Sequence, residues 1–369
     1  MAPALFTPTK LGAYTLKHRV VLAPLTRNRA DPKTLVPSDM AIEYYKQRAS
    51  DGGLLITEGA FISAEAGGIA GAPGIFSDEQ VAKWREIADA VHAKGGRIFI
   101  QIWALGRTAN PALVPVVYGP SGEPYVANPK KPVPVPVKEM TEEDIDRFVA
   151  NYAKAAKNAI AAGCDGVEIH GANGYIVDQF LQSVSNKRTD SYGGDINGRT
   201  KFPLRVLDAV CAAIGPERVG IRMSPFGIVQ GMREKVPLDT FLPYAKLIVK
   251  HQPKLAYVHA VTPRTYGTTD MPENMVVKDD DLEPIRRVVR DAGIAFISAG
   301  GYRPEGALKA AEDTGDLIGM GRYFISNPDL PARIAHEWDL TNYDRKTFYT
   351  NGAHGYIDYP TYKGETAKL

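Results

Sequence analysis

The sequence predicts an α/β fold, a single (β/α)8 TIM barrel that spans residues 1–369. Two observations predict it. Short apolar runs alternate along the chain with segments of helical periodicity, and eight such pairs follow one another without a change in composition. The main alternative is an open doubly wound sheet. That fold is disfavoured because no Gly-x-Gly-x-x-Gly turn of the dinucleotide-binding kind follows a predicted strand.

The predicted strands are short and apolar on both faces, which is typical of parallel strands that are buried on both sides. We expect them, in chain order, at residues 20–22, 54–57, 98–101, 167–169, 219–223, 255–259, 296–298 and 317–319.

Two of the intervening helices carry clear start signals. Ser77 and Gln80 form a capping box before an apolar helical pattern, and Gly95 follows its end. Thr141 and Asp144 open a second helix, which stops at Gly163. Weaker helical patterns cover residues 40–50, 202–214, 238–250, 281–290, 304–312 and 328–337.

The segment 108–138, after the third predicted strand, is rich in proline and too long for a tight loop. We expect it to cap the barrel mouth as an excursion with a small hairpin.

Composition and charge restrict the classes of partner. The chain carries 44 Lys+Arg against 42 Asp+Glu, which argues against a dedicated nucleic-acid binder. No apolar run approaches the roughly 18 residues of a membrane span, and the first residues lack a secretory pattern. Only Cys164 and Cys211 occur, so a disulfide scaffold is disfavoured. We expect a cytoplasmic protein, with the peroxisome as second expectation because Ala367-Lys368-Leu369 resembles a Ser-Lys-Leu address.

The carboxyl ends of barrel strands are where active sites lie, so residues there are the first candidates. Gly300 and Gly301 follow the seventh predicted strand, and Gly321 and Arg322 follow the eighth. Glycine lets backbone N–H groups approach an anion, and arginine clamps it, so we expect a phosphate site. The alternative is that these glycines only permit tight turns.

The loop after the fourth predicted strand carries His170, Asn173 and Tyr175. Two N–H donors for one oxygen and a separate phenolic proton suit the reduction of a polarised double bond. The alternative is that His170 and Asn173 satisfy loop backbone groups while Tyr175 packs on the rim. Glu168, inside the strand, is expected to point outward to the helices.

The residue patterns typical of metal sites, Schiff bases and serine nucleophiles are absent from the sequence. No His-x-His or His-Glu-x-x-His pair indicates a metal site, so we expect none. No lysine stands at a predicted strand end for a Schiff base, and no Gly-x-Ser-x-Gly elbow offers a serine nucleophile.

Ordered blocks of residues resemble the Old Yellow Enzyme family of flavin-dependent ene reductases over nearly the whole chain. The matching stretches are residues 23–27, 57–60, 167–170, 173–175, 186–190, 192–194, 321–322, 326–330 and 354–360.

The resemblance implies a bound FMN and the residues around it. The cofactor-binding residues would be Pro24, Leu25, Thr26, Gly59, Ala60, Gln101, Arg222, Gly300, Gly301, Gly321, Arg322 and Phe348. The substrate-binding residues would be His170, Asn173, Tyr175, Trp103, Ile69, Val229 and Tyr349. Many relatives carry aromatic residues in place of Ile69 and Val229, so we expect an altered pocket.

The implied activity is reduction of the C=C bond of an α,β-unsaturated carbonyl compound, an enone or enal. NADPH or NADH would give hydride to FMN N5, which would pass it to the β-carbon in a ping-pong cycle. His170 and Asn173 would bind the carbonyl oxygen, and Tyr175 would protonate the α-carbon. The expected assembly is a monomer or homodimer. Two alternatives stay open: another FMN barrel enzyme, such as an isomerase or 2-hydroxy-acid oxidase, and a non-catalytic flavin-binding barrel.

Overall fold

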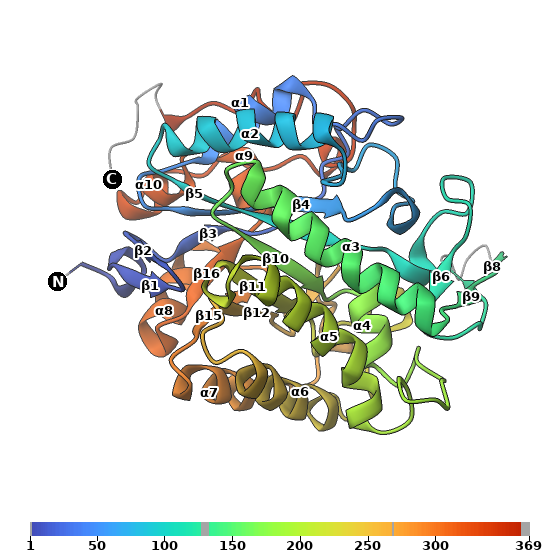
Figure 1. The fold of residues 1–369 in the computed structure, drawn as a ribbon. Helices are drawn as coiled ribbons and strands as arrows, with labels where there is room; N and C mark the ends of the chain where they lie inside the picture. The colour runs from blue at the N-terminus through green and yellow to red at the C-terminus, as the bar shows by residue number, and fades with distance from the viewer. Residues whose placement is uncertain (1, 127–132, 268, 363–369) are drawn as a thin grey trace.

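A closed barrel of eight parallel strands forms the centre of the molecule in the computed structural model, which describes residues 2–126, 133–267 and 269–362 (Figure 1). The strands are β3 (Val20–Leu22), β4 (Leu54–Phe61), β5 (Arg97–Trp103), β10 (Gly166–Gly171), β11 (Val219–Met223), β12 (Tyr257–Val261), β15 (Ala295–Ala299) and β16 (Leu317–Met320). They pair in chain order, and β16 closes the barrel on β3. Each of the eight predicted strands overlaps one of them, so the predicted barrel is confirmed.

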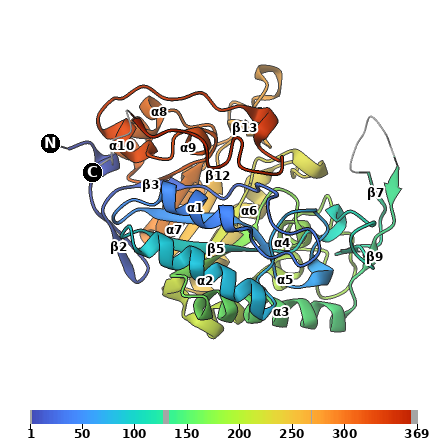
Figure 2. The same cartoon turned by 90° about the horizontal axis from the view of Figure 1, so that it is seen from above.

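Helices surround the barrel (Figures 1 and 2). They are α1 (Asp39–Arg48), α2 (Asp78–His92), α3 (Glu142–Ala161), α4 (Ile176–Leu181), α5 (Ile196–Ile214), α6 (Pro237–His251), α7 (Glu283–Asp291), α8 (Pro304–Thr314), α9 (Arg322–Ser326) and α10 (Leu330–Ala335). Both predicted helix starts are confirmed, and each has a capping box, at Ser77 before α2 and at Thr141 before α3. Helix α4 was not predicted, because its six residues are too few to show a helical period.

Side chains alternate along each barrel strand between the helices and the barrel interior. In β10, Val167 and Ile169 pack outward in the helix-facing core. Glu168 therefore points inward, where its carboxylate accepts a hydrogen bond from Gln101 Nε2 (2.7 Å). The expectation that Glu168 faces the helices is wrong, because it lies two residues before His170 and shares its direction.

The two ends of the barrel interior differ in polarity. At the amino end, the hairpin of β1 (Thr9–Leu11) and β2 (Tyr14–Leu16) places Leu11 and Leu16 against Phe99 and Tyr257 in an apolar plug. Figure 1 shows this hairpin at the opposite side of the molecule from the segment that follows β5. The carboxyl end is left for polar side chains.

The described part of the segment after β5 contains four very short strands, and two more follow β12. The four are β6 (Tyr118–Gly119), β7 (Tyr125–Val126), β8 (Pro134–Val135) and β9 (Lys138–Glu139). Strands β7 and β8 pair as a small antiparallel hairpin. The hairpin after β12 consists of β13 (Thr265–Tyr266) and β14 (Thr269–Asp270). Both hairpins contribute residues to the wall of a cavity.

No helix within the described ranges is both long and apolar enough to cross a membrane. Residues 367–369, the basis of the peroxisomal expectation, lie outside the described residues.

We predict that Gly220→Ala destabilises the barrel. A Cβ at Gly220 in β11 would stand 2.2 Å from the Tyr257 ring, which is fully buried. Overpacking of this kind costs about 1–3 kcal/mol, and thermal unfolding followed by circular dichroism would measure it. The control is Gly306→Ala in α8, where the nearest heavy atom is 3.9 Å away. The control should match or slightly exceed wild-type stability, whereas a wild-type melting temperature for Gly220→Ala would contradict the packing.

Candidate active site

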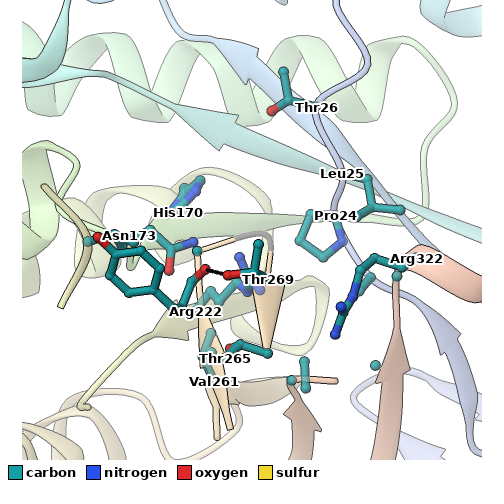
Figure 3. A pocket seen from close by; sticks show the side chains of 18 of the residues that line it. Pro24, Leu25, Thr26, His170, Asn173, Arg222, Val261, Thr265, Thr269 and Arg322 are labelled. Atoms are coloured by element: carbon teal, nitrogen blue, oxygen red, sulfur yellow. Dashed lines mark hydrogen bonds between the residues drawn. The ribbon is translucent and has the colours of Figure 1, made fainter. Parts of the chain in front are cut away.

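A cavity of about 850 Å³ lies at the carboxyl ends of the barrel strands (Figure 3). It brings together residues that are far apart in the sequence. The predicted site residues in its wall are Pro24, Leu25, Thr26, Gln101, Trp103, His170, Asn173, Tyr175, Arg222, Val229, Gly300, Gly301, Gly321, Arg322, Phe348 and Tyr349. A volume of this size is in the range of cofactor and ligand pockets.

Three predicted residues do not line the cavity. Gly59 lies behind the Trp103 ring, since a Cβ there would be 2.4 Å from a ring carbon. Ala60 is fully buried in the helix-facing core. Ile69 packs against the cluster of Phe61 and its neighbours.

A buried polar network lies in the barrel interior beside the cavity. Glu168 Oε1 accepts from Gln101 Nε2, and its Oε2 lies 2.8 Å from His259 Nδ1. Burial alone would raise the pKa of Glu168, but His259 and then Arg222 hold that pKa below its usual value. Burial lowers the pKa of His259, so its imidazole is neutral and donates from Nδ1. The charges of the Glu168 carboxylate and the Arg222 guanidinium therefore stabilise each other inside the barrel.

His170 presents a hydrogen-bond donor to the cavity. Burial, followed by the nearby Arg222 charge, lowers the pKa of His170 well below its ordinary value, so the ring is neutral. Its Nδ1 accepts from the Ala172 N–H (3.3 Å). A neutral imidazole with one accepting nitrogen carries its proton on the other, so Nε2 is the donor.

Three rings pack together on this wall and restrain one another. The Trp103 and His170 rings are stacked, with centroids 5.7 Å apart. The Tyr175 ring meets both edge-on, at 4.7 Å from Trp103 and 4.8 Å from His170. Burial raises the pKa of Tyr175 to about 12, so the phenol stays protonated at neutral pH. Asn173 lies beside His170 at the same part of the cavity (Figure 3).

The other end of the cavity is built for an anion. Gly300 and Gly301 have φ of +135° and +66°, and a Cβ at Gly300 would stand 2.3 Å from Thr262 Oγ1. The turn itself thus requires glycine, and the same lack of side chains leaves the backbone open to the cavity. Arg322 supplies a guanidinium at this end.

Arg322 is already paired with a carboxylate. Its Nη2 binds Asp270 of the β13–β14 hairpin, and its Nη1 lies 3.3 Å from the Tyr343 hydroxyl. The hydrogen bond and charge of Arg322, with further lowering by Arg345 and Arg303, depress the pKa of Asp270. Three arginines are therefore near one acidic side chain here.

The C-terminal segment is tied over the cavity by two arginines from the loop after β3. Arg27 Nε donates to the Phe348 carbonyl oxygen (3.2 Å), and Arg29 Nη2 donates to that of Thr347 (3.0 Å). These bonds hold Phe348 and Tyr349 in the cavity wall. Figure 2 shows this red segment beside α1.

Sequence reasoning missed several wall residues, most of which lie on the short hairpins or near a 3-10 turn, and the others at the end of β12, after β15 and in α9. These are Tyr125, Val126, Ile228, Gln230, Gly231, Val261, Thr265, Tyr266, Gly267, Thr269, Tyr302, Tyr323 and Ile325. For Tyr125 and Val126, the only signal was the proline-rich excursion, which did not indicate which of its residues would reach the cavity.

Comparisons with known proteins agree with this geometry. The model of the NADH:flavin oxidoreductase / NADH oxidase family matches residues 4–341. Flavin oxidoreductase hxnT of Emericella nidulans is 43% identical, covering 96% of this chain and 97% of the relative. Enoate reductase 1 of Kluyveromyces lactis is 41% identical, and the match covers 99% of this chain and 95% of that relative. The solved Old Yellow Enzyme homologue from Zymomonas mobilis superposes with a TM-score of 0.88 at 38% identity, and the match covers 98% of this chain and 100% of that one.

Glu58, at the carboxyl side of β4, should make stability depend on pH. Its Oε2 accepts from the Arg27 N–H (3.0 Å), and burial raises its pKa from 4.5 to about 7. Because the folded pKa exceeds the unfolded value, the contribution of this carboxyl to stability is full below pH 4.5 and is lost as pH rises through about 7.

We therefore predict that Glu58→Gln, which does not titrate, gains up to roughly 3 kcal/mol over wild type between about pH 5 and pH 8. Thermal unfolding across this pH range measures the gain. In the control, Asp144→Asn, the difference from wild type should stay constant, because Asp144 has a pKa lowered to about 2. A constant difference for Glu58→Gln as well would contradict the pKa.

Proposed function

This chain belongs to the NADH:flavin oxidoreductase / NADH oxidase family and to the Old Yellow Enzymes within it, and on that premise we propose which residues of the cavity do its chemistry. The protein is an NAD(P)H-dependent flavin oxidoreductase of the ene-reductase type, and FMN is its cofactor. The observation that carries the assignment of roles is that the His170 donor, Asn173 and the Tyr175 phenol share one wall of one cavity.

The residues of the cavity fit FMN. Arg222 Nε is a buried donor without a partner among the described residues, which suits a polar ring edge. Gly300, Gly301, Gly321 and Arg322 would hold the phosphate. Pro24, Leu25, Thr26, Gln101 and Phe348 would surround the ring. Bound FMN would supply a two-electron carrier between NADPH or NADH and the second substrate.

His170 and Asn173 would bind the carbonyl oxygen of an enone or enal. The neutral His170 ring donates from Nε2, and the amide of Asn173 supplies a second N–H. The His170 ring is restrained by its ring contacts and the Asn173 backbone by Ser224, so the two donors would stabilise the negative charge that develops on the oxygen. Removal of one such preorganised donor typically costs 10²- to 10³-fold in rate.

Tyr175 would give the proton. Its pKa of about 12 keeps the phenol in the acidic form, and its ring is restrained by Trp103 and His170. Trp103, Val229 and Tyr349 would shape the space in which the substrate lies, together with Tyr125 from the excursion. Nicotinamide and enone would use the same space in turn.

The donor set favours reduction over the oxidase and isomerase alternatives. An oxidase needs a group that accepts a proton from the substrate carbon. Here the imidazole is a neutral donor and the phenol is protonated, so this wall offers protons. The expectations of a cytoplasmic location and of a monomer or homodimer stay predictions.

Tyr175→Phe should slow reduction of cyclohexenone about 10²- to 10⁴-fold, because the transition state loses its proton donor. Flavin reduction by the nicotinamide should stay near the wild-type rate. Anaerobic stopped-flow absorbance of the two half-reactions separates them. The control, Tyr14→Phe, removes a hydroxyl that binds the Asp165 carbonyl oxygen at the amino end of the barrel and should change neither rate. Equal losses in both half-reactions would reject the proton-donor role.

Asp270→Asn should tighten FMN binding about two- to fivefold, because the carboxylate competes with the phosphate for Arg322. Fluorescence titration of the flavin-free protein measures the dissociation constant. Riboflavin, which lacks the phosphate, should bind both proteins equally. Asp146→Asn, which breaks a surface pair with Arg205, serves as control. Weaker FMN binding by Asp270→Asn would show that the carboxylate supports the site.

A further inference from the structure

The turn that carries Asn173 is in an unfavourable backbone conformation. Asn173 and Gly174 have φ of +57° and +79°, so two consecutive residues are left-handed. Glycine adopts this region freely, and asparagine adopts it more readily than most residues but still at some cost. A flexible loop would not keep the Asn173 side chain in the cavity, so the bonds that hold the turn matter for the site.

Buried side chains bind three backbone groups of this turn. The Asn173 N–H donates to Ser224 Oγ (2.7 Å). The Gly174 N–H donates to Asp178 Oδ2 (2.8 Å), and the Gly174 carbonyl oxygen accepts from Gln179 Nε2 (2.7 Å). Asp178 and Gln179 are neighbours in α4, so one short helix grips both sides of residue 174.

Both gripping side chains are themselves held in place. Asp178 Oδ1 accepts from Gln182 Nε2 (2.8 Å), one turn further along α4. Gln179 Nε2 also donates to the Leu105 carbonyl oxygen (2.9 Å), and its Oε1 accepts from the Arg107 N–H (3.1 Å). Gln179 thus joins the turn to the loop after β5.

Asp178 and Gln179 are fully buried, and neither lines the cavity. A buried carboxylate is costly, and burial raises the pKa of Asp178 to about 7 despite its donors. An apolar side chain would pack here at lower cost but would leave the Gly174 N–H unbound. Tyr175, in contrast, is restrained by the rings of Trp103 and His170.

We propose that Asp178, with Gln179, is a positioning residue for the reaction: the two clamp the Gly174 peptide groups and so hold Asn173 in the conformation that binds the substrate oxygen. The inference rests on the proposed function, because it assigns to the clamp the purpose of aiming Asn173. Asp178 acts through the turn and does not touch the substrate.

A double-mutant cycle on the FMN-loaded enzyme tests this proposal. Asp178→Ala and Asn173→Ala should each lower kcat/KM for cyclohexenone, the first about 10-fold and the second about 100-fold. If Asp178 acts by aiming Asn173, then Asp178→Ala should cost less than about twofold when Asn173 is already alanine. Asp178→Asn, which keeps an acceptor for the Gly174 N–H, should restore most of the activity.

A control variant and the remaining outcomes distinguish failure of the clamp from failure of the oxygen-binding role proposed for Asn173. Asp144→Ala removes a similarly buried carboxylate from the cap of α3, so its effect should be equal in both backgrounds. Equal losses from Asp178→Ala in both backgrounds would overturn the clamp. Wild-type kcat/KM for Asn173→Ala would instead overturn the oxygen-binding role of Asn173, and the clamp with it. If Asp178→Ala does not fold, Gln179→Ala, which removes the donor to the Gly174 carbonyl oxygen, replaces it in the same cycle.

Discussion

The alternation of side chains along closed barrel strands is the constraint on which this site depends. Every second residue of a strand must enter the interior, and a closed sheet directs these residues to a common axis. Phe99, Gln101 and Trp103 of β5 therefore follow one another from the apolar plug to the cavity. Glu168 and His170 do the same in β10. A polar residue placed near the carboxyl end of each strand is therefore enough to bring such residues together in one cavity.

Burial then determines the charge states of the side chains that meet at the carboxyl end of the barrel. The Arg222 guanidinium is balanced by the Glu168 carboxylate, which is bound by Gln101 and His259. The two imidazoles are neutral because burial and the Arg222 charge oppose a second cation. The barrel interior thus contains a guanidinium and a carboxylate whose charges compensate each other, with neutral donors beside them. This arrangement suits binding of an oxygen that gains negative charge during reaction.

The barrel and much of the candidate site could be predicted because their signals are local. An apolar run with β-branched residues marks a buried strand, and the next residues mark its carboxyl end, as at His170 and Arg322. Local signals do not give the direction of a side chain unless the register is followed, which is why Glu168 was misplaced. The hairpins that bring Tyr125 and Thr265 to the cavity depend on long-range packing, and two-residue strands have no period to detect. The hydrogen bonds around Gly174 could not be predicted, because the sequence does not show which backbone groups the side chains of α4 contact.

The bonds from Arg27 and Arg29 to residues 347 and 348 have a consequence for how the protein is made. The acceptors of these arginines leave the ribosome more than 300 residues after the arginines themselves. Until then, two buried guanidinium groups lack their carbonyl partners and the cavity lacks its Phe348 wall. The pocket can therefore be completed only after residues 347 and 348, which follow the last barrel strand, have been translated.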